Sequence, residues 1–425
     1  MTTAPLASAE FGELARTGPA VAGMAALHAG LRGRRQLLLK ALLVRVQRER
    51  DQLDPGTVRG FDGAWRLLEQ AERAHPAVVR EVLDYPTTGA WLAAALGAAP
   101  GAELGRRLGR FESIAATAAL RAGRALDLSV PAPQGALSLA GVGRFHVGAE
   151  RVRIRSRARV AWIAPDGAGT AHGALLLAHP GTGRLAGLGP AWSGLRLLPG
   201  AVALLDDLDP YRVPPGGVGA PPRTATDRTG TDARTWARHW RGAQHLLARV
   251  DPVRAAEVRR TVRVVVPLST GGPPAVSMSA TLRAAPGAVL ASQPTSARSM
   301  AETLVHEIHH GKLAALHELV PLHRPGRAAV HRVGWRSDPR PLAGVLQGAY
   351  AHLALTDLWW RARESENAPP SWRARAGQRF ERFHVQVGGA LEILLESDEL
   401  TIAGREFVKH MRHHHASLGR VRRAI

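Results

Sequence analysis

The spacing of apolar residues changes along the chain and divides it into three regions. Positions 24–50 carry apolar residues at helical spacing with basic residues on the opposite face, and positions 101–127 repeat this pattern. The pairs Asp54-Pro55 and Tyr85-Pro86 indicate breaks between helices. Residues 1–130 are therefore predicted to form a helical N-terminal region.

From about residue 131 to residue 292, proline and glycine become frequent and short alternating runs replace the helical period. Strands are predicted at 151–155, 160–163, 262–268 and 275–278. Residues 208–234, rich in Pro, Gly and Thr, predict a long loop, and residues 235–259 predict a return to helix. This middle region is thus expected to be rich in strands.

After residue 293 the helical pattern returns, with an interruption at 321–340. A helix is predicted at 294–320, and its apolar stripe is expected to face the core: Met300, Leu304, Ile308, Ala315 and Leu319. Another helix is predicted to open near Leu342, with Pro341 in its first turn. The fold class is α+β, with a helical N-terminal region, a strand-rich middle and a helical C-terminal region (293–425).

Composition narrows the possible classes of protein. A chain of 425 residues exceeds one ordinary core, so we expect two domains, or one large domain with an appended region. The absence of cysteine excludes disulfides, thiolate zinc sites, iron–sulfur clusters and thiol nucleophiles. No apolar run approaches the roughly 20 residues that span a membrane, and the first thirty residues do not resemble a signal peptide. A cytoplasmic protein with no membrane partner is expected.

The net charge of +21 invites a nucleic-acid function. However, only three of the 56 basic residues are lysines, and the arginines are scattered without a clustered aromatic platform for bases. We therefore expect no nucleic-acid partner. An acidic peptide or an organic acid would be attracted by the same field.

One segment, His306-Glu307-Ile308-His309-His310, has the spacing of a metal-binding helix. His306 and His310 lie four residues apart, so their rings project from one face and can reach one ion. Glu307 is rotated by one residue, near the metal yet free to act as a base or as a partner of a ligand. The segment predicts a metal site with Glu307 as the candidate catalytic residue.

The usual inference from such a helix is a zinc metallopeptidase, which we keep as the alternative. The metzincin extension is absent, because Leu313 and Leu316 stand where it needs glycine and histidine. A gluzincin takes its third ligand from a glutamate on a following helix, but none occurs between Leu319 and Arg363. Glu318 lies on the metal helix itself and is out of reach. A peptidase would therefore lack its third ligand.

His352, about three turns into the following helix, is the best-placed third ligand, and Asp338 and Asp357 are the oxygen alternatives. Asp357 lies about 140° around that helix from His352, so the two would not serve the same ion. Arg336 and Arg340 flank a turn beside the predicted site. They are either a clamp for a carboxylate or ordinary salt-bridging residues.

Three blocks resemble the HExxH-type 2-oxoglutarate-dependent peptide β-hydroxylases, which occur in actinobacterial biosynthesis of ribosomally made, post-translationally modified peptides. The blocks are His306-Glu307-x-x-His310, Trp335-Arg336-x-Asp338-Pro339-Arg340-Pro341 and Gln347-Gly348-Ala349-Tyr350-Ala351-His352. The segment Asp206-Asp207-Leu208-Asp209-Pro210-Tyr211-Arg212 is also similar to that family. These specific motifs extend from about residue 200 to residue 365.

The resemblance implies an Fe(II) enzyme with 2-oxoglutarate as cosubstrate. It would hydroxylate a Cβ–H bond in a residue of a precursor peptide and release succinate and CO₂. The implied metal ligands are His306, His310 and His352, and the implied 2-oxoglutarate-binding residues are Arg336 and Arg340. This all-nitrogen set departs from the two histidines and one carboxylate of most non-haem iron oxygenases. With no cysteine for a radical-SAM cluster, the form would be stand-alone, and a radical-SAM or other maturation enzyme would be a separate partner.

Overall fold

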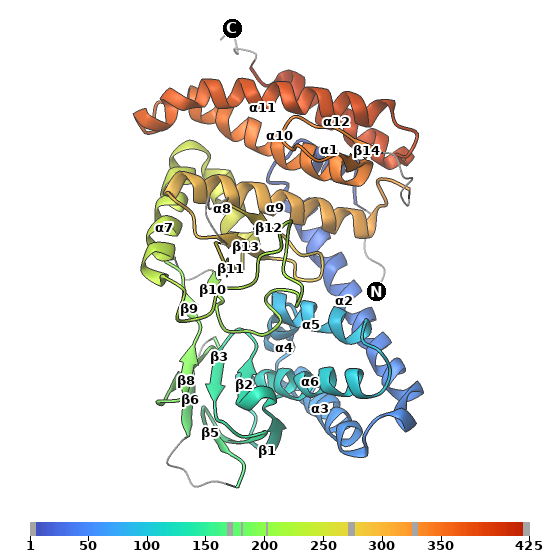
Figure 1. Ribbon diagram of the computed structural model, residues 1–425, viewed down its shortest axis with the longest axis vertical. Helices are drawn as coiled ribbons and strands as arrows, with labels where there is room; N and C mark the ends of the chain where they lie inside the picture. The colour runs from blue at the N-terminus through green and yellow to red at the C-terminus, as the bar shows by residue number, and fades with distance from the viewer. Residues whose placement is uncertain are drawn as a thin grey trace.

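The computed structural model describes residues 6–167, 173–179, 182–200, 203–270, 277–324 and 330–419. Within them the predicted α+β fold class is confirmed (Figure 1). Helices make up the N-terminal part, strands and two further helices make up the middle, and long helices make up the C-terminal part. Among the described helices, none has the length and apolar character needed to cross a membrane.

The helices of the N-terminal part are α1 (Ser8–Ala15), α2 (Val21–Arg48), α3 (Pro55–Ala74), α4 (Pro76–Leu83), α5 (Pro86–Leu96) and α6 (Ala102–Arg121). The predicted helices at 24–50 and 101–127 correspond to α2 and α6. Proline opens α3, α4 and α5 at the first helical position, where no backbone donor is required. Helices α3 to α6 pack around Phe61, Trp91 and Phe111. Helix α1 instead packs on the last helix of the chain, where Phe11 meets Phe407.

The middle part contains separate sheets. One is antiparallel, in the order β1 (Leu126–Pro131), β4 (Arg151–Arg157), β5 (Val160–Pro165), β6 (Ala174–Ala178), β7 (Leu185–Leu188). A smaller one is β2 (Ala136–Leu139), β3 (Gly143–His146), β8 (Trp192–Gly194). The mixed sheet runs β12 (Ser279–Ala280), β13 (Ala288–Ser292), β11 (Val264–Leu268), β10 (Leu204–Leu205), β9 (Arg196–Leu197). Its parallel strands β11 and β13 are buried throughout, which explains their continuous apolar sequence.

The predicted strands at 151–155, 160–163 and 262–268 are confirmed as β4, β5 and β11. The strand predicted at 275–278 is not found: positions 275 and 276 lie outside the described residues, and the next strand begins at Ser279. The predicted loop at 208–234 precedes α7 (Ala233–Val250). The return to helix predicted at 235–259 is confirmed, but it is divided between α7 and α8 (Pro252–Thr261), a separate helix that Asp251 caps. Pro252 cannot continue α7.

The C-terminal part consists of α9 (Ala297–Leu319), a short ribbon of β14 (Val330–His331) and β15 (Arg340–Pro341), α10 (Leu342–Glu364), α11 (Pro370–Glu396) and α12 (Ile402–Ser417). Helix α9 lies between the mixed sheet with α7 and α8 on one side and the layer of α10, α11 and α12 on the other (Figure 1). It therefore crosses the centre of the molecule.

The predicted apolar stripe of α9 is buried at Met300, Leu304, Ile308 and Ala315. Leu319 is a correction, since it is 38% exposed at the last residue of the helix. Pro341 is a smaller correction: it is the N-cap of α10 and lies in β15, one residue before the first turn.

Candidate metal centre

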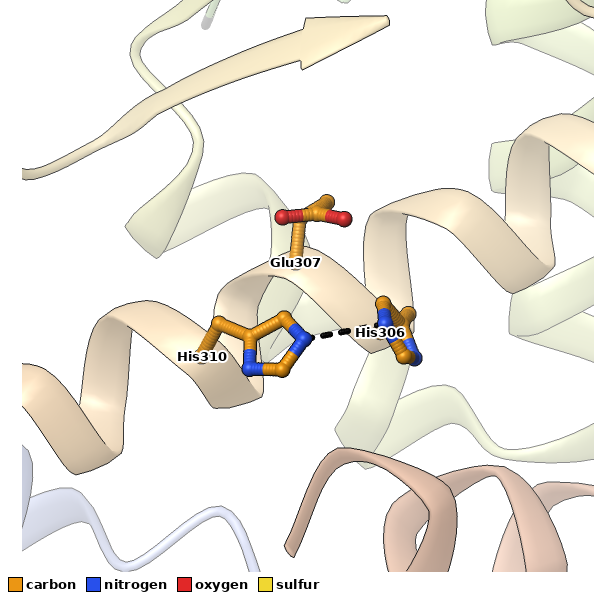
Figure 2. A group of neighbouring side chains, drawn as sticks. All are labelled: His306, Glu307 and His310. Carbon is orange, nitrogen blue, oxygen red and sulfur yellow. Dashed lines mark hydrogen bonds between the residues drawn. The ribbon is translucent and has the colours of Figure 1, made fainter. Parts of the chain in front are cut away.

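The motif histidines lie in the middle of α9, a helix that Ser296 begins by accepting a hydrogen bond from the backbone N–H of Ser299. The Nε2 atoms of His306 and His310 are 3.0 Å apart, and their rings meet edge to face (Figure 2). Two nitrogens bound at about 2.1 Å to a single ion lie about 3 to 3.4 Å apart. The pair is therefore spaced as two ligands of one metal ion would be.

His352 brings a third imidazole from α10. Its ring centroid lies 5.1 Å from that of His306. Its Nδ1 donates a hydrogen bond to the carbonyl oxygen of Gly348, one turn earlier, at 2.8 Å. The lone pair of the ring is therefore on Nε2. The ring is held on one side by the stacked indole of Trp335 and on another by Phe383.

Gln347 orients the second motif histidine. Its Oε1 lies 3.1 Å from Nδ1 of His310, so Nδ1 carries the proton and Nε2 remains available as a ligand atom. Gln347 and Gly348 are neighbours at the start of α10. One turn of that helix thus fixes the tautomers of His310 and His352 together.

Burial keeps His306 and His352 neutral. It lowers the pKa of His306 well below the ordinary value, and the nearby His310 and His352 lower it further. Burial also lowers the pKa of His352 to about 4, although its hydrogen bond to Gly348 acts in the opposite direction. At neutral pH both rings are unprotonated, which is the form that binds a metal.

The Glu307 carboxylate lies beside the histidine pair but is held by other residues. One of its oxygens and one ring nitrogen each of His306 and His310 all lie within 4.8 Å of one another. Ser279 Oγ donates to one carboxylate oxygen at 2.6 Å, and Thr281 Oγ1 donates to the other at 2.7 Å. In Figure 2 the carboxylate rises from α9 to the side of the two imidazoles. Both oxygens are thus engaged by hydroxyl groups of the mixed sheet, which favours a positioning role over that of a free base.

The centre therefore offers three imidazoles from two helices, with a fixed carboxylate alongside. No protein-family model matches the chain, and no curated protein matches it. What the site can do must follow from its own residues. Nitrogen ligands with a lone pair suit Zn²⁺ and Fe²⁺ alike, so ligand type alone does not choose between hydrolytic and oxidative chemistry.

The oxygen alternatives for the third ligand have other partners. Asp338 is exposed and lies between two arginines, with Arg336 Nε at 2.8 Å and Arg340 Nη2 at 2.9 Å. Asp357 is buried and pairs with Arg254 and Arg361. Among the described residues, the group of potential ligand atoms that lie close enough together consists of His306, Glu307 and His310, and it includes none of the three candidates. His352 is the one of the three candidates whose ring lies against His306.

The aspartate-rich segment at 206–212 forms a structural junction. Tyr85 donates to Asp206 at 2.8 Å, Arg228 pairs with Asp207 at 2.9 Å, and Arg110 pairs with Asp209. Burial and the neighbouring Asp209 raise the pKa of Asp206 to about 6. These contacts tie the N-terminal helices to the strand-rich part, so the segment supports the fold, and among the described residues it makes no hydrogen bond or ion pair with the histidines of the metal centre.

His309, the remaining histidine of the motif, faces a different side of α9. It is fully buried, with Nδ1 2.7 Å from the carbonyl oxygen of Val305 and Nε2 3.0 Å from Arg254 Nη1. Arg254 also pairs with Glu257, which in turn pairs with Lys312 at 2.5 Å. We call Arg254, Glu257, Asp357, His309 and Lys312 the buried ion cluster. The sequence pattern gave no sign of it, because its members come from three helices.

Proposed function

We propose that the protein is an Fe(II)- and 2-oxoglutarate-dependent hydroxylase that acts on a Cβ–H bond in a residue of a ribosomally made precursor peptide, releasing succinate and CO₂. The observation that carries the proposal is the meeting of His306, His310 and His352 beside a glutamate whose two oxygens are already engaged. In a peptidase that glutamate must accept the proton of a metal-bound water. Here Ser279 and Thr281 fix its orientation by donating one hydrogen bond to each oxygen, which suits a positioning role.

The donor set fits a metal ion. The 3.0 Å separation of the His306 and His310 nitrogens and the fixed tautomers of His310 and His352 are what one ion requires. A bound Fe(II) ion would supply the redox chemistry that couples decarboxylation of 2-oxoglutarate to hydroxylation. The protein's own contribution is to hold three imidazole nitrogens in place and to pack Trp335 and Phe383 against the ring of His352, which limits the access of water to that ligand.

The arginine pair fits a dicarboxylate cosubstrate. The Asp338 side chain already shows that one carboxylate can bridge both guanidiniums, because each of its oxygens contacts a different arginine. A carboxylate of 2-oxoglutarate would take the place of Asp338 between Arg336 and Arg340. Trp335, next to Arg336 in sequence, stacks on His352 and so links this turn to the metal site.

The proposed setting follows from the same assignment. The enzyme would work in the cytoplasm, with the precursor peptide as substrate. A radical-SAM or other maturation enzyme, where one takes part, would be a separate protein, since this chain has no cysteine to hold such a cluster.

The test is a spectrum and a product assay on the purified protein. Protein loaded with Fe(II) and 2-oxoglutarate without oxygen should show the weak visible charge-transfer band of a chelated 2-oxo acid. His306→Ala should abolish the band, whereas the control His413→Ala, which removes an exposed histidine of α12, should not. Tightly bound zinc, peptide cleavage and no succinate would instead establish the zinc metallopeptidase.

A further inference from the structure

A cluster of basic side chains lines a cavity of about 440 Å³ beside α9. Its walls come from α2, from the end of α8 and the residues that lead into β11, and from α9 itself. The basic residues in its lining are His28, Arg32, Arg35, Arg184, Arg259, Arg260, Arg263 and Lys312, and of these Lys312 pairs with Glu257. The cavity therefore collects positive charge from two helices that are far apart in sequence.

Apart from Lys312, little of this charge is neutralised by carboxylates. Among the described residues no ion pair joins Arg32, Arg35, Arg259, Arg260 or Arg263 to Asp or Glu, and Asp84 is the one acidic residue in the lining. Arg35 donates to the backbone carbonyls of Leu83 and Tyr85, and Arg263 donates to that of Asp84. By contrast, the exposed arginines of β4 share Asp127. The cavity thus lacks the counter-charge that other arginine clusters of this protein have.

The neighbouring cations lower the pKa of titratable groups in this cavity. Burial lowers the pKa of His28, and Arg32 and Arg263 lower it further. Burial lowers the pKa of Arg35 to about 10, and Arg263 adds to this effect although Asp84 opposes it. A bound anion would relieve the repulsion among these groups.

A neighbouring cavity of about 400 Å³ shares Leu31, Arg35 and Pro286 with this one, and apolar residues of α2 and α5 form part of its walls. A third cavity, of about 1070 Å³, shares Ala93, Arg283 and Ala284 with the 400 Å³ cavity. The three follow the segment 282–287, which begins one residue after Thr281, the donor to Glu307. We call them together the arginine groove.

We propose that the arginine groove binds an acidic segment of a polypeptide in extended form. Carboxylates of that segment would meet the guanidiniums of the 440 Å³ cavity, and its backbone and apolar side chains would lie along Leu38, Leu92 and Leu96 in the next. A small phosphate compound would fill the first cavity alone and leave the others unused. Identifying the segment as part of the hydroxylase's peptide substrate rests on the proposed function, but the binding itself does not.

Binding is tested with fluorescein-labelled hexaglutamate and the full-length, metal-free protein, by fluorescence anisotropy. The wild type should bind this probe, added salt should weaken binding, and hexaglutamine should not bind. The double variant Arg259→Glu, Arg260→Glu should bind at least about tenfold more weakly, since two attractions become repulsions. The matched control Arg373→Glu, Arg375→Glu makes the same charge change at exposed positions of α11 and should bind as the wild type does.

Circular dichroism and melting temperature check that each variant folds, and Arg32→Gln provides a milder change should the double variant unfold. Equal weakening in both double variants would show that only net charge matters and would overturn the proposal. Binding of inorganic pyrophosphate without binding of hexaglutamate would also overturn it, since the cavity would then be a small-anion site. Failure to bind iron or 2-oxoglutarate contradicts the proposed function and leaves the anisotropy result standing.

Discussion

His309 and Lys312 belong to the buried ion cluster on one side of α9. On another side of this helix, His306 and His310 lie near His352. Within the cluster each cation has an anion, and both ring nitrogens of His309 have partners. At the metal centre, two Nε2 atoms face each other at 3.0 Å, and Gln347 places the proton of His310 on the far nitrogen. A buried polar group with all its partners stabilises the fold. A buried histidine nitrogen whose lone pair faces no hydrogen-bond donor can bind a metal ion.

The largest effect should come from the buried ion cluster. Glu257→Gln removes the carboxylate that lies between Arg254 and Lys312 and leaves two buried cations without it. Breaking such a pair from one side costs about 3–5 kcal/mol, and the free energy of unfolding should fall by that amount in urea denaturation. Metal affinity should change little. A variant of normal stability with weakened metal binding would reverse the roles given to the two sides of α9.

The metal centre should respond in the opposite way. His306→Ala and His310→Ala should each weaken metal binding by more than the roughly 10–100-fold that follows loss of a ligand's hydrogen-bond partner, and turnover should be lost. Stability of the metal-free protein should stay close to that of the wild type, because neither ring belongs to the apolar stripe. Chelator competition measures the affinity and urea denaturation measures the stability.

The third ligand is tested in the same assay. His352→Ala should weaken metal binding as strongly as His306→Ala does, because its ring lies against His306 and its Nε2 is free. Asp338→Ala should retain normal affinity. The reverse result, with His352→Ala normal and Asp338→Ala weakened, would assign the third position to Asp338.

Acid should destabilise the metal-free centre. The pKa of His352 in the folded protein, about 4, lies below its ordinary value of 6.5. Its contribution to stability is therefore fully present above pH 6.5 and is lost as the pH falls from 6.5 through 4, by about 2–3 kcal/mol. His306 and His309 act in the same direction. The metal-free His352→Ala variant should thus lose less free energy of unfolding over this range, and equal losses would contradict the assigned shift.

Those parts of the fold and site that depend on local pattern could be predicted from the sequence. The pairing of His306 with His310 follows from helical spacing, and the placing of His352 follows from the length of its own helix. The break between α7 and α8 was also visible, because Asp251-Pro252 repeats the Asp-Pro signal that marks the start of α3.

The contacts that separate the two sides of α9 could not be predicted. Ser279 and Thr281 reach Glu307 because β12 packs beside α9, although no spacing in the sequence connects them. Lys312 donates to the carbonyl oxygen of Gly18, which is 294 positions away. Such contacts depend on how distant segments pack, and a hydrophobic pattern gives no information on that.

The smallest expected effect concerns the arginine pair. Arg340→Ala or Arg336→Ala removes a charge-assisted contact to one carboxylate of 2-oxoglutarate, and such losses at buried sites cost about 2–5 kcal/mol. The side chains of Arg336 and Arg340 are 45% and 35% exposed, so solvent screening places the effect near the lower limit. About 1.4 kcal/mol corresponds to a tenfold change. The KM for 2-oxoglutarate should therefore rise by at least about tenfold, whereas affinity for the peptide should change much less.

Two further variants show whether the pair acts as a clamp. Arg340→Lys should restore affinity only in part, because an ammonium group lacks the planar fork of donors. Asp338→Asn should act in the opposite direction and lower the KM, since the carboxylate that now bridges both arginines would no longer compete with the cosubstrate. Each cosubstrate is titrated at saturating levels of the other. If both alanine variants lose peptide affinity and keep that for 2-oxoglutarate, Arg336 and Arg340 contact the peptide substrate. The charged side chains near the histidines would then either stabilise the fold or bind the peptide, and none of them would bind 2-oxoglutarate.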